Sequence, residues 1–319
     1  MSSAVPKIVT LVGVGVIGRG WIRVFAPHGA TVRVYDPNPA QIPQTLAWLA
    51  QDLNSDVAEG FATAEERDRI LRATTGESDL AKALADADYV QESAPEKLDV
   101  KHALFAELDR LAPAKAILAS STSALDISEI AKGLPGERRC VMAHPFNPPH
   151  LMPVVEMLGA AGTDPAILQK ACDMLAACGQ IPVRMNRYVK GFLGNRIQAA
   201  VVREALHLVE TGVADPVAVD AVIRDALALR WATIGNFGAN HANADEGIAQ
   251  YFSRYGASYA MLMEDLDSAP PRFDPQVLRQ IADAIEAREG VKGVAAFVRK
   301  RDVMVKELNR LKRRHEAKK

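Results

Sequence analysis

The stretch KIVTLVGVGVIGRGWIRVFAPHGATVRVYD, residues 7–36, decides the fold of this chain. Residues 8–12 are aliphatic and β-branched, which predicts a buried strand. Gly13, Gly15 and Gly18 then give the pattern G-x-G-x-x-G where a helix would begin. In such a unit the first glycine allows a tight turn, the second lets the backbone approach a pyrophosphate, and the third lets the helix pack closely on the strand. The stretch therefore predicts a dinucleotide-binding βαβ unit.

The acid that follows the next strand indicates which dinucleotide binds. The apolar run 31–35 ends at Asp36, eighteen residues after Gly18. A carboxylate at this place can accept both ribose hydroxyls of adenosine, and it would repel a 2′-phosphate. The free N–H groups at the helix start favour phosphate charge. We therefore expect NAD rather than NADP. The alternative is a glycine-rich turn in another kind of α/β protein, which would leave the spacing between Gly18 and Asp36 unexplained.

Length and composition bound the class of protein. A chain of 319 residues with 49% apolar residues predicts two globular domains. The formal net charge of −1 gives no bulk reason to expect nucleic acid or anionic lipid as a partner. No apolar run is long enough to span a membrane, and the N-terminal residues run straight into the first strand without room for a signal peptide. We expect a cytoplasmic protein.

The cysteines argue against covalent or metal cross-links. Cys140, Cys172 and Cys178 are an odd, sparse set without C-x-x-C spacing. Such a set is typical of buried, reduced thiols rather than of a disulfide framework or a zinc site. We expect no bound metal.

The character of the sequence changes near residue 188. Up to there, strand and helix patterns alternate, which predicts a Rossmann-type doubly wound parallel sheet. Beyond it the pattern is helical, over residues 191–211, 216–229, 245–266, 275–288 and 293–312. We expect an NAD-binding Rossmann domain over 1–188 and an all-helical substrate and dimerisation domain over 189–319. The basic end, KELNRLKRRHEAKK, is either a site for an anionic partner or a solvated helix end.

One histidine is placed for chemistry. His144 directly follows the predicted strand 138–143, and ligands of open α/β sheets bind where strands end. Glu156 lies in the apolar run PVVEML, where a lone carboxylate needs a partner. Paired with Glu156, the imidazole would be oriented and its charged form stabilised. The alternative is a hydrogen-bonded structural histidine.

Other polar groups lie at comparable positions. Ser123 lies in the strand-end cluster SSTSAL, Asn195 in GFLGNR and Asn147 near the histidine. They can hydrogen-bond a substrate oxygen without carrying charge, or they can cap helices and turns. Glu96 and Lys101, in APEKLDVK, follow another strand end and either touch the cofactor or lie on an exposed helix start.

Together the motifs GVGVIG, APEKLDVK, SSTSAL, HPFNPP, VVE and GFLGNR resemble the L-3-hydroxyacyl-CoA dehydrogenase superfamily over essentially the whole chain. The resemblance implies that His144 is a general base, that Glu156 is its partner, and that Ser123 and Asn195 contact the reacting oxygen. It also implies a set of residues along NAD: Gly13, Val16, Ile17, Asp36, Glu96, Lys101 and Asn147.

Within the superfamily, the segment LRWATIGNFGANHANADEG, residues 229–247, is similar to the lambda-crystallin and L-gulonate 3-dehydrogenase branch. Two residues depart from the expected patterns. Ser121 replaces an asparagine usual in the acyl-CoA enzymes, and Asn236 replaces a proline expected in the gulonate branch. The resemblance therefore implies the reaction class more firmly than the substrate.

Charge favours a small free acid as substrate. Residues 42–66 contain no Lys or Arg and several acids, which would repel the phosphates of a CoA thioester. Arg230 is the candidate counterion for a substrate carboxylate, and His241 and Asn243 are candidates for hydrogen bonds to substrate hydroxyls. We expect NAD-dependent oxidation of the 3-hydroxyl of a small hydroxy acid, most like L-gulonate 3-dehydrogenase, in a homodimer formed through the helical domain.

Three alternatives remain open. A carnitine 3-dehydrogenase would need an aromatic cage, for which the chain offers Trp231, Phe237, Tyr251, Phe252 and Tyr255. A 3-hydroxyacyl-CoA dehydrogenase, for example one acting on 3-hydroxybutyryl-CoA, is the second. The third is a non-catalytic, NAD-binding structural protein of the crystallin kind, which would not require the set of His144, Glu156, Ser123 and Asn195.

Overall fold

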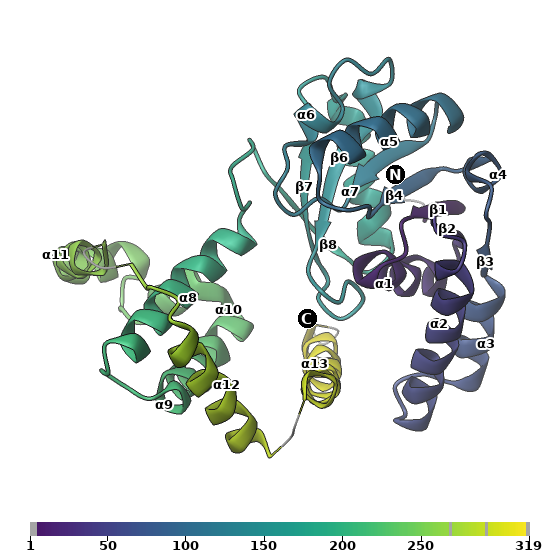
Figure 1. The fold of residues 1–319 in the computed structure, drawn as a ribbon. Coiled ribbons are helices and arrows are strands. Elements are labelled where there is room, and N and C mark those ends of the chain that lie inside the picture. Colours follow the sequence, from purple (N-terminus) through teal and green to yellow (C-terminus); the bar gives the residue numbers. More distant parts are fainter. Residues whose placement is uncertain (1–4, 268–269, 291–292, 317–319) are drawn as a thin grey trace. The chain divides into compact units, whose positions relative to one another are not determined.

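The computed structural model describes residues 5–267, 270–290 and 293–316 (Figure 1). The chain divides into two compact units. The first unit comprises Met1–Leu193 together with Met304–Lys319, and the second comprises Gly194–Val303. The end of the chain thus groups with the nucleotide-binding part, whereas the sequence analysis placed all of 189–319 in one helical domain.

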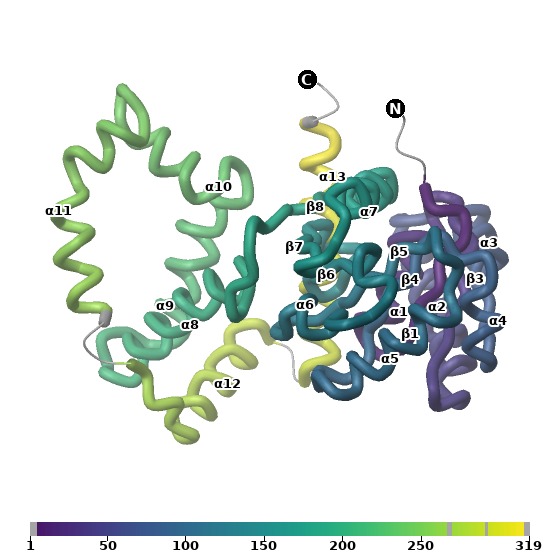
Figure 2. Tube along the Cα trace, turned by 90° about the horizontal axis from the view of Figure 1, so that it is seen from above, coloured from purple at the N-terminus to yellow at the C-terminus, as the bar shows by residue number. Residues whose placement is uncertain are grey.

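An eight-stranded sheet forms the centre of the first unit, in the order β3-β2-β1-β4-β5-β6-β7-β8 (Figure 2). Its strands are β1 (Ile8–Val12), β2 (Thr31–Tyr35), β3 (Thr74–Gly76), β4 (Tyr89–Glu92), β5 (Ile117–Ser120), β6 (Cys140–Pro145), β7 (Val154–Gly159) and β8 (Ile181–Arg184). The sheet confirms the predicted Rossmann-type architecture with one departure, because β7 runs antiparallel to β6. Only residues 146–153 join the two strands, too few for the crossover that a parallel pair requires.

Helices cover both faces of this sheet (Figure 1). They are α1 (Val16–Phe25), α2 (Gln41–Ala58), α3 (Ala64–Arg72), α4 (Leu80–Leu84), α5 (Leu98–Leu111), α6 (Ile127–Ile130) and α7 (Pro165–Ala177). One core lies on the side of α1, α2 and α7 and includes Trp21, Leu49 and Leu175. The other lies under α5 and α6 and includes Phe105 and Ile127. Because both faces are covered, every residue of the central strands β4, β5 and β6 is buried, rather than every second one.

The second unit is helical, as the sequence predicts. It contains α8 (Gly194–Glu210), α9 (Pro216–Ala221), the π-helical segment η3 (Val222–Ala228), α10 (Leu229–His241), α11 (Ile248–Asp267), α12 (Pro275–Glu289) and the start of α13 (Val294–Glu316). The sequence analysis did not predict α10, which bends at Gly235, where φ is 74°. Among the described residues of this unit, the buried apolar side chains are few: Leu206, Val219 and Ala239. The unit therefore keeps much apolar surface outside its own core.

Within the described ranges, no helix is both long enough and apolar enough to cross a bilayer. The three cysteines are unpaired and buried, as predicted.

Candidate active site

The glycine turn leaves room for a pyrophosphate. Gly13 has φ of 84°, and a Cβ there would lie 2.9 Å from the backbone of Ser93. A Cβ on Gly18 would lie 1.9 Å from the Gly13 carbonyl oxygen, so the helix packs too closely on the turn for any side chain. Gly15, in contrast, faces open space to beyond 4 Å, and no side chain caps the start of α1 at this residue. The turn therefore offers uncovered helix N–H groups to a phosphate, which suits a dinucleotide.

The carboxylate of Asp36 is held at the turn by the backbone. Its Oδ2 accepts a hydrogen bond from the Val14 N–H at 3.0 Å, and its Oδ1 accepts one from the Asn38 N–H at 2.9 Å. Each carboxylate oxygen keeps a further lone pair, which is what two ribose hydroxyls need. Of the two residues that open α1, Val16 is exposed and Ile17 is half-buried.

His144 and Glu156 form a direct pair across the sheet. They face each other in the antiparallel register of β6 and β7, and the imidazole Nδ1 lies 2.7 Å from Glu156 Oε2. The other oxygen, Oε1, accepts a hydrogen bond from the Leu193 N–H at 2.7 Å. His144 is 7% exposed and Glu156 is 1% exposed, so water screens the pair little. An Nδ1–H that donates to the carboxylate leaves Nε2 as the acceptor of the neutral ring, which is the arrangement of a general base.

Aromatic rings surround the imidazole. The ring centroid of Phe192 lies 5.3 Å from that of His144, and the centroid of Phe146 lies 5.7 Å away. These rings limit the orientations of the imidazole and keep its surroundings apolar, which strengthens its interaction with Glu156.

The loop after His144 packs against the nucleotide turn. A Cβ on Gly20 would lie 2.6 Å from the Pro149 ring, so α1 and the HPFNPP segment are in close contact. Asn147 lies in this loop, is exposed and precedes a cis peptide bond to Pro148. The catalytic candidate His144 and the cofactor candidate Asn147 are thus at the same edge of the sheet as the glycine turn.

Glu96 organises the loop that carries Ser123. Its Oε1 accepts hydrogen bonds from Thr122 Oγ1 at 2.5 Å and from the N–H groups of Ser123 and Ala124, both at 2.9 Å. Although burial alone would raise it, the pKa of Glu96 is lowered by the Thr122 hydroxyl, the nearby charge of Lys101 and the two N–H groups. Glu96 therefore holds the Ser123 loop as an ionised carboxylate.

Lys101 belongs to a buried ion pair that the sequence analysis missed. Its Nζ lies 2.7 Å from Glu92 Oε1, 3.0 Å from the Ala94 carbonyl and 3.5 Å from Glu96 Oε2. Glu92 is fully buried at the end of β4 and also accepts a hydrogen bond from Ser120 at 2.6 Å. The signal was present, because a carboxylate inside an apolar strand needs a cationic partner. Lys101 thus fixes the end of β4 and the segment that follows it, and its contact with NAD stays a prediction.

Ser121, which directly follows β5, lies in a hydrogen-bond network with side chains of α1 and β4. Its hydroxyl accepts from Trp21 Nε1 at 3.1 Å and from Gln91 Nε2 at 2.8 Å, and lies 2.9 Å from the Ser93 hydroxyl. The residue that departs from the acyl-CoA pattern therefore links α1, β4 and β5.

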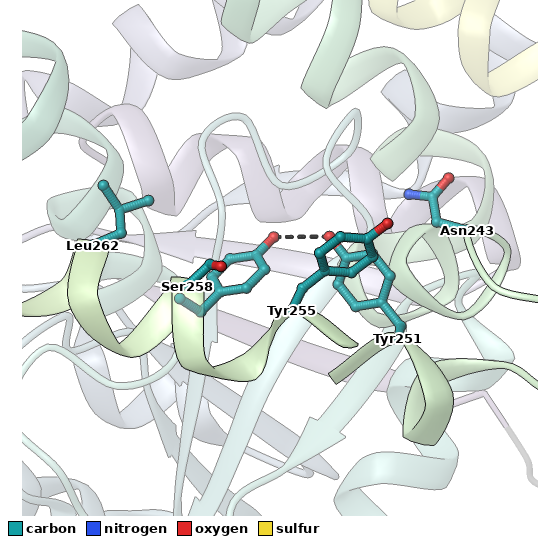
Figure 3. Close-up of a pocket in the computed structure, with 6 residues that line it drawn as sticks. Asn243, Tyr251, Tyr255, Ser258 and Leu262 are labelled. Carbon is teal, nitrogen blue, oxygen red and sulfur yellow. Dashed lines mark hydrogen bonds between the residues drawn. The ribbon is translucent and has the colours of Figure 1, made fainter. Parts of the chain in front are cut away.

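The remaining candidates belong to the second unit. Asn195 lies in the first turn of α8, Arg230 at the start of α10, and His241 at its end. The Nδ1 of His241 accepts a hydrogen bond from the Ile248 N–H at 3.3 Å, which stabilises the start of α11. Asn243 lines a pocket of about 530 Å³ along α11, together with Tyr251, Tyr255, Ser258, Tyr259 and Leu262 (Figure 3). Of the predicted substrate residues, Asn243 is therefore the one that lines this pocket.

The acidic segment of α2 has partners that the sequence did not reveal. Arg23 pairs with both Asp52 and Asp56. Lys306, in the middle of α13, lies 2.5 Å from Asp56 and 3.4 Å from Glu59. The basic end of the chain therefore finds an anionic partner in its own α2, and part of the negative charge expected to repel CoA is neutralised.

Two further contacts hold the end of α13. Asn309 Nδ2 donates to the Leu151 carbonyl at 2.7 Å, and the Arg310 guanidinium lies 4.1 Å from the centre of the Phe61 ring. These contacts explain why residues after 303 group with the first unit.

Within the part of the chain that the structure describes, no cluster of three or more His, Cys, Asp or Glu residues could hold a metal ion.

Comparisons with known proteins find relatives that extend over most of this chain. A lambda-crystallin homolog from Bos taurus is 39% identical over 84% of each chain, and an L-carnitine dehydrogenase from Streptomyces griseus is 36% identical over 92% of this chain and 86% of its own. The solved structure of a 5-formyl-3-hydroxy-2-methylpyridine-4-carboxylic acid 5-dehydrogenase matches with a TM-score of 0.78 and 25% identity, covering 97% of this chain and 98% of its own.

The family comparison covers both units. The NAD-binding domain of 3-hydroxyacyl-CoA dehydrogenase matches residues 8–188, and the C-terminal domain of the same family matches residues 191–286. The chain therefore belongs to the 3-hydroxyacyl-CoA dehydrogenase family of NAD-dependent oxidoreductases.

Proposed function

We propose that this protein oxidises the 3-hydroxyl of a small, free hydroxy acid with NAD, as an L-gulonate 3-dehydrogenase would. The observation that carries the proposal is the buried His144–Glu156 pair, with its 2.7 Å contact at the strand edge that also carries the glycine turn. A histidine so held is a general base rather than a structural residue, because its Nε2 is left to accept a proton.

In the proposed reaction, His144 accepts the proton of the substrate hydroxyl through Nε2. Glu156 holds the ring through Nδ1 and offsets the positive charge that the ring gains. Ser123, on the loop fixed by Glu96, and Asn195 position the reacting oxygen and stabilise it as it becomes a carbonyl oxygen. When bound, NAD would supply the acceptor for the carbon-bound hydrogen, which leaves the substrate as hydride.

Residues along the glycine turn hold the cofactor in this proposal. Gly13, Gly15 and Gly18 admit the pyrophosphate, and Asp36 receives the adenosine ribose. A carboxylate at the ribose selects NAD, since a 2′-phosphate would meet like charge.

The choice of a small acid rests on the relatives and on local charge. Lambda-crystallin homologs and L-carnitine dehydrogenases are among the similar proteins that extend over most of this chain, and a 3-hydroxyacyl-CoA dehydrogenase is among the similar solved structures. The acids of α2 favour the same choice less strongly than expected, because Arg23 and Lys306 neutralise Asp52 and Asp56. A carnitine 3-dehydrogenase is the second candidate, favoured by the 36% identity to the Streptomyces griseus enzyme.

The proposal includes a homodimer formed through the helical unit. Phe237 and Met261 are both 72% exposed and Ile197 is 66% exposed. Apolar surface of this kind, on a unit with a small core of its own, favours burial against a second copy.

A panel of oxidations tests the function. NADH formation is measured with L-gulonate, L-carnitine, 3-hydroxybutyrate and 3-hydroxybutyryl-CoA on one preparation, with His144→Gln as the control. We expect the highest kcat/KM with a free hydroxy acid and the loss of several powers of ten in kcat in the variant. Preference for the CoA thioester would contradict the substrate, and equal activity of the variant would contradict the mechanism.

A further inference from the structure

Phe192 has an unusual backbone conformation beside the His144–Glu156 pair. It is fully buried and has a φ of 50°, and Gly191 before it has a φ of 80°. A bulky side chain rarely adopts a positive φ, because its Cβ crowds the backbone there. Such a conformation is strained and persists only where the surrounding contacts hold it. The contacts of residues 188–193, the last segment of the first unit, therefore have to maintain this strain.

Two consecutive residues of this segment contact the pair, one member each. The ring centroid of Phe192 lies 5.3 Å from that of His144, and the Leu193 N–H donates to Glu156 Oε1 at 2.7 Å. Rotation about the φ angle of Phe192 moves its ring and the Leu193 peptide together, relative to the turn before them. An ordinary negative φ would therefore take both contacts away from the pair. The strained angle and the two contacts thus belong to one arrangement.

The turn before Phe192 is anchored to the loop that carries Ser123. The Phe192 N–H donates to the Val189 carbonyl at 2.9 Å, and the Tyr188 hydroxyl donates to the carbonyl of Ala124, the residue after Ser123, at 2.8 Å. The rings of Tyr188 and Phe192 meet edge to face, with centroids 6.0 Å apart. One short segment thus connects this loop with the pair.

We infer that residues 188–193 form a strap that positions the pair for proton transfer. The Leu193 N–H fixes the carboxylate of the pair, through a hydrogen bond that the charge strengthens. The Phe192 ring limits the rotation of the imidazole, and Tyr188 ties the strap to the loop that carries Ser123. All three are positioning residues, because they act through the pair and the loop. The inference rests on the proposed function, in which the histidine of the pair is the base.

Phe192→Leu tests the ring, since leucine keeps an apolar side chain without it. Steady-state NADH formation with the best substrate of the panel gives kcat and KM, and fluorescence titration gives the Kd of NADH. A misplaced base lowers turnover rather than binding, so kcat should fall about ten- to a hundredfold while KM and the Kd stay within about twofold. Phe273→Leu is the matched control and should turn over as the wild type does, because Phe273 also has a positive φ, 55°, but is exposed between α11 and α12.

A backbone ester at residue 193 tests the hydrogen-bond donor. Incorporation of the α-hydroxy acid that corresponds to leucine replaces the Leu193 N–H by oxygen and keeps the side chain. Glu156 then loses a hydrogen bond to its charge, which should lower kcat about ten- to a hundredfold. The same ester at Leu278 is the control and should leave kcat unchanged, because it also removes one backbone hydrogen bond, to the Asp274 carbonyl at the start of α12.

A spectroscopic readout separates positioning from a general loss of structure. The proton on His144 Nδ1 gives an NMR signal that is identified by its absence in His144→Gln, and its chemical shift depends on the length of the hydrogen bond to Glu156. Phe192→Leu and the ester at residue 193 should shift this signal, whereas both controls should leave it in place.

Tyr188→Phe is the mildest variant and keeps the inference testable if Phe192→Leu does not fold. It removes only the hydroxyl that donates to Ala124, and should lower kcat about three- to tenfold. The inference is overturned if the strap variants keep kcat within twofold of the wild type with the His144 signal unchanged, or if they raise KM at an unchanged kcat. The wild-type panel decides the proposed function by itself: without NADH formation that function fails, whereas the His144 signal still decides the positioning.

Discussion

Replacing Glu156 by glutamine removes one charge from a buried pair and keeps its shape. In the wild type, the carboxylate accepts the His144 Nδ1–H and the Leu193 N–H, each at 2.7 Å. Glutamine offers one acceptor oxygen for these two donors, so one of them loses its partner. The variant therefore lacks both the negative charge beside the protonated imidazole and one of the two hydrogen bonds.

The expected magnitude follows from this geometry. The charge centres of the imidazolium and the carboxylate lie about 4 Å apart, which corresponds to about 4 kcal/mol at an effective dielectric constant near 20. Because both side chains are more than nine-tenths buried, solvent screens little of this energy. At about 1.4 kcal/mol per factor of ten, losing half to most of it lowers kcat by about a hundred- to a thousandfold.

Steady-state NADH formation gives kcat and KM, and fluorescence titration gives the Kd of NADH. We expect Glu156→Gln to lower kcat and to leave the Kd of NADH within about twofold. His144→Gln combined with Glu156→Gln should be scarcely worse than His144→Gln alone, because the two residues act as a unit. A kcat within threefold of the wild type, or additive losses in the double variant, would refute the pairing as the source of catalysis.

Three further predictions concern the cofactor and the stability of the first unit. Asp36→Ala should weaken NAD about tenfold and raise the ratio of kcat/KM for NADP over NAD; an unchanged ratio would contradict the role of the carboxylate. Loss of surrounding water lowers the pKa of His150 to about 3, so the unfolded chain binds a proton that the folded chain does not. The free energy of unfolding should therefore fall below pH 6.5 by up to about 1.4 kcal/mol per pH unit, and His150→Leu should flatten this dependence in urea titrations. Lys306→Ala should lower the free energy of unfolding by about 1–3 kcal/mol, whereas Lys312→Ala, at an exposed position, should not. An equal loss of stability in the two variants would contradict the role of the contact between α13 and α2.

The sequence predicts best the features that local pattern determines. Strands β1 and β2 have the bounds expected from their apolar runs, because a buried parallel strand is a short aliphatic segment between turn residues. Two local signals, a histidine at a strand end and a lone acid in an apolar run, suggested the pairing of His144 with Glu156, and the family resemblance implied it. The structure adds the antiparallel register that places them opposite each other.

Features that depend on distant residues were predicted less well. An exposed helix start was one of two expectations for Lys101, yet this residue of α5 is buried against Glu92 of β4, a partner that the sequence analysis did not assign to it. Helix α10 has no regular apolar face, and Gly235 interrupts it, so its pattern did not predict a helix. The contact of Lys306 with Asp56 joins residues 250 positions apart, a pairing that charge composition alone does not specify.

The docked end of α13 changes how charge bears on the substrate. From sequence, the acids of α2 formed a free negative surface that would exclude a phosphorylated ligand. In the structure Asp56 pairs with two cations, Arg23 and Lys306. A third cation, Arg310 of α13, lies over the ring of Phe61, shortly after the end of α2. A surface whose charges are paired repels weakly, because the field of each carboxylate is cancelled within a few ångströms. In the proposed function, a free acid would therefore be distinguished from a thioester by a group that recognises its carboxylate. Arg230 is the candidate counterion that the sequence offers for this carboxylate.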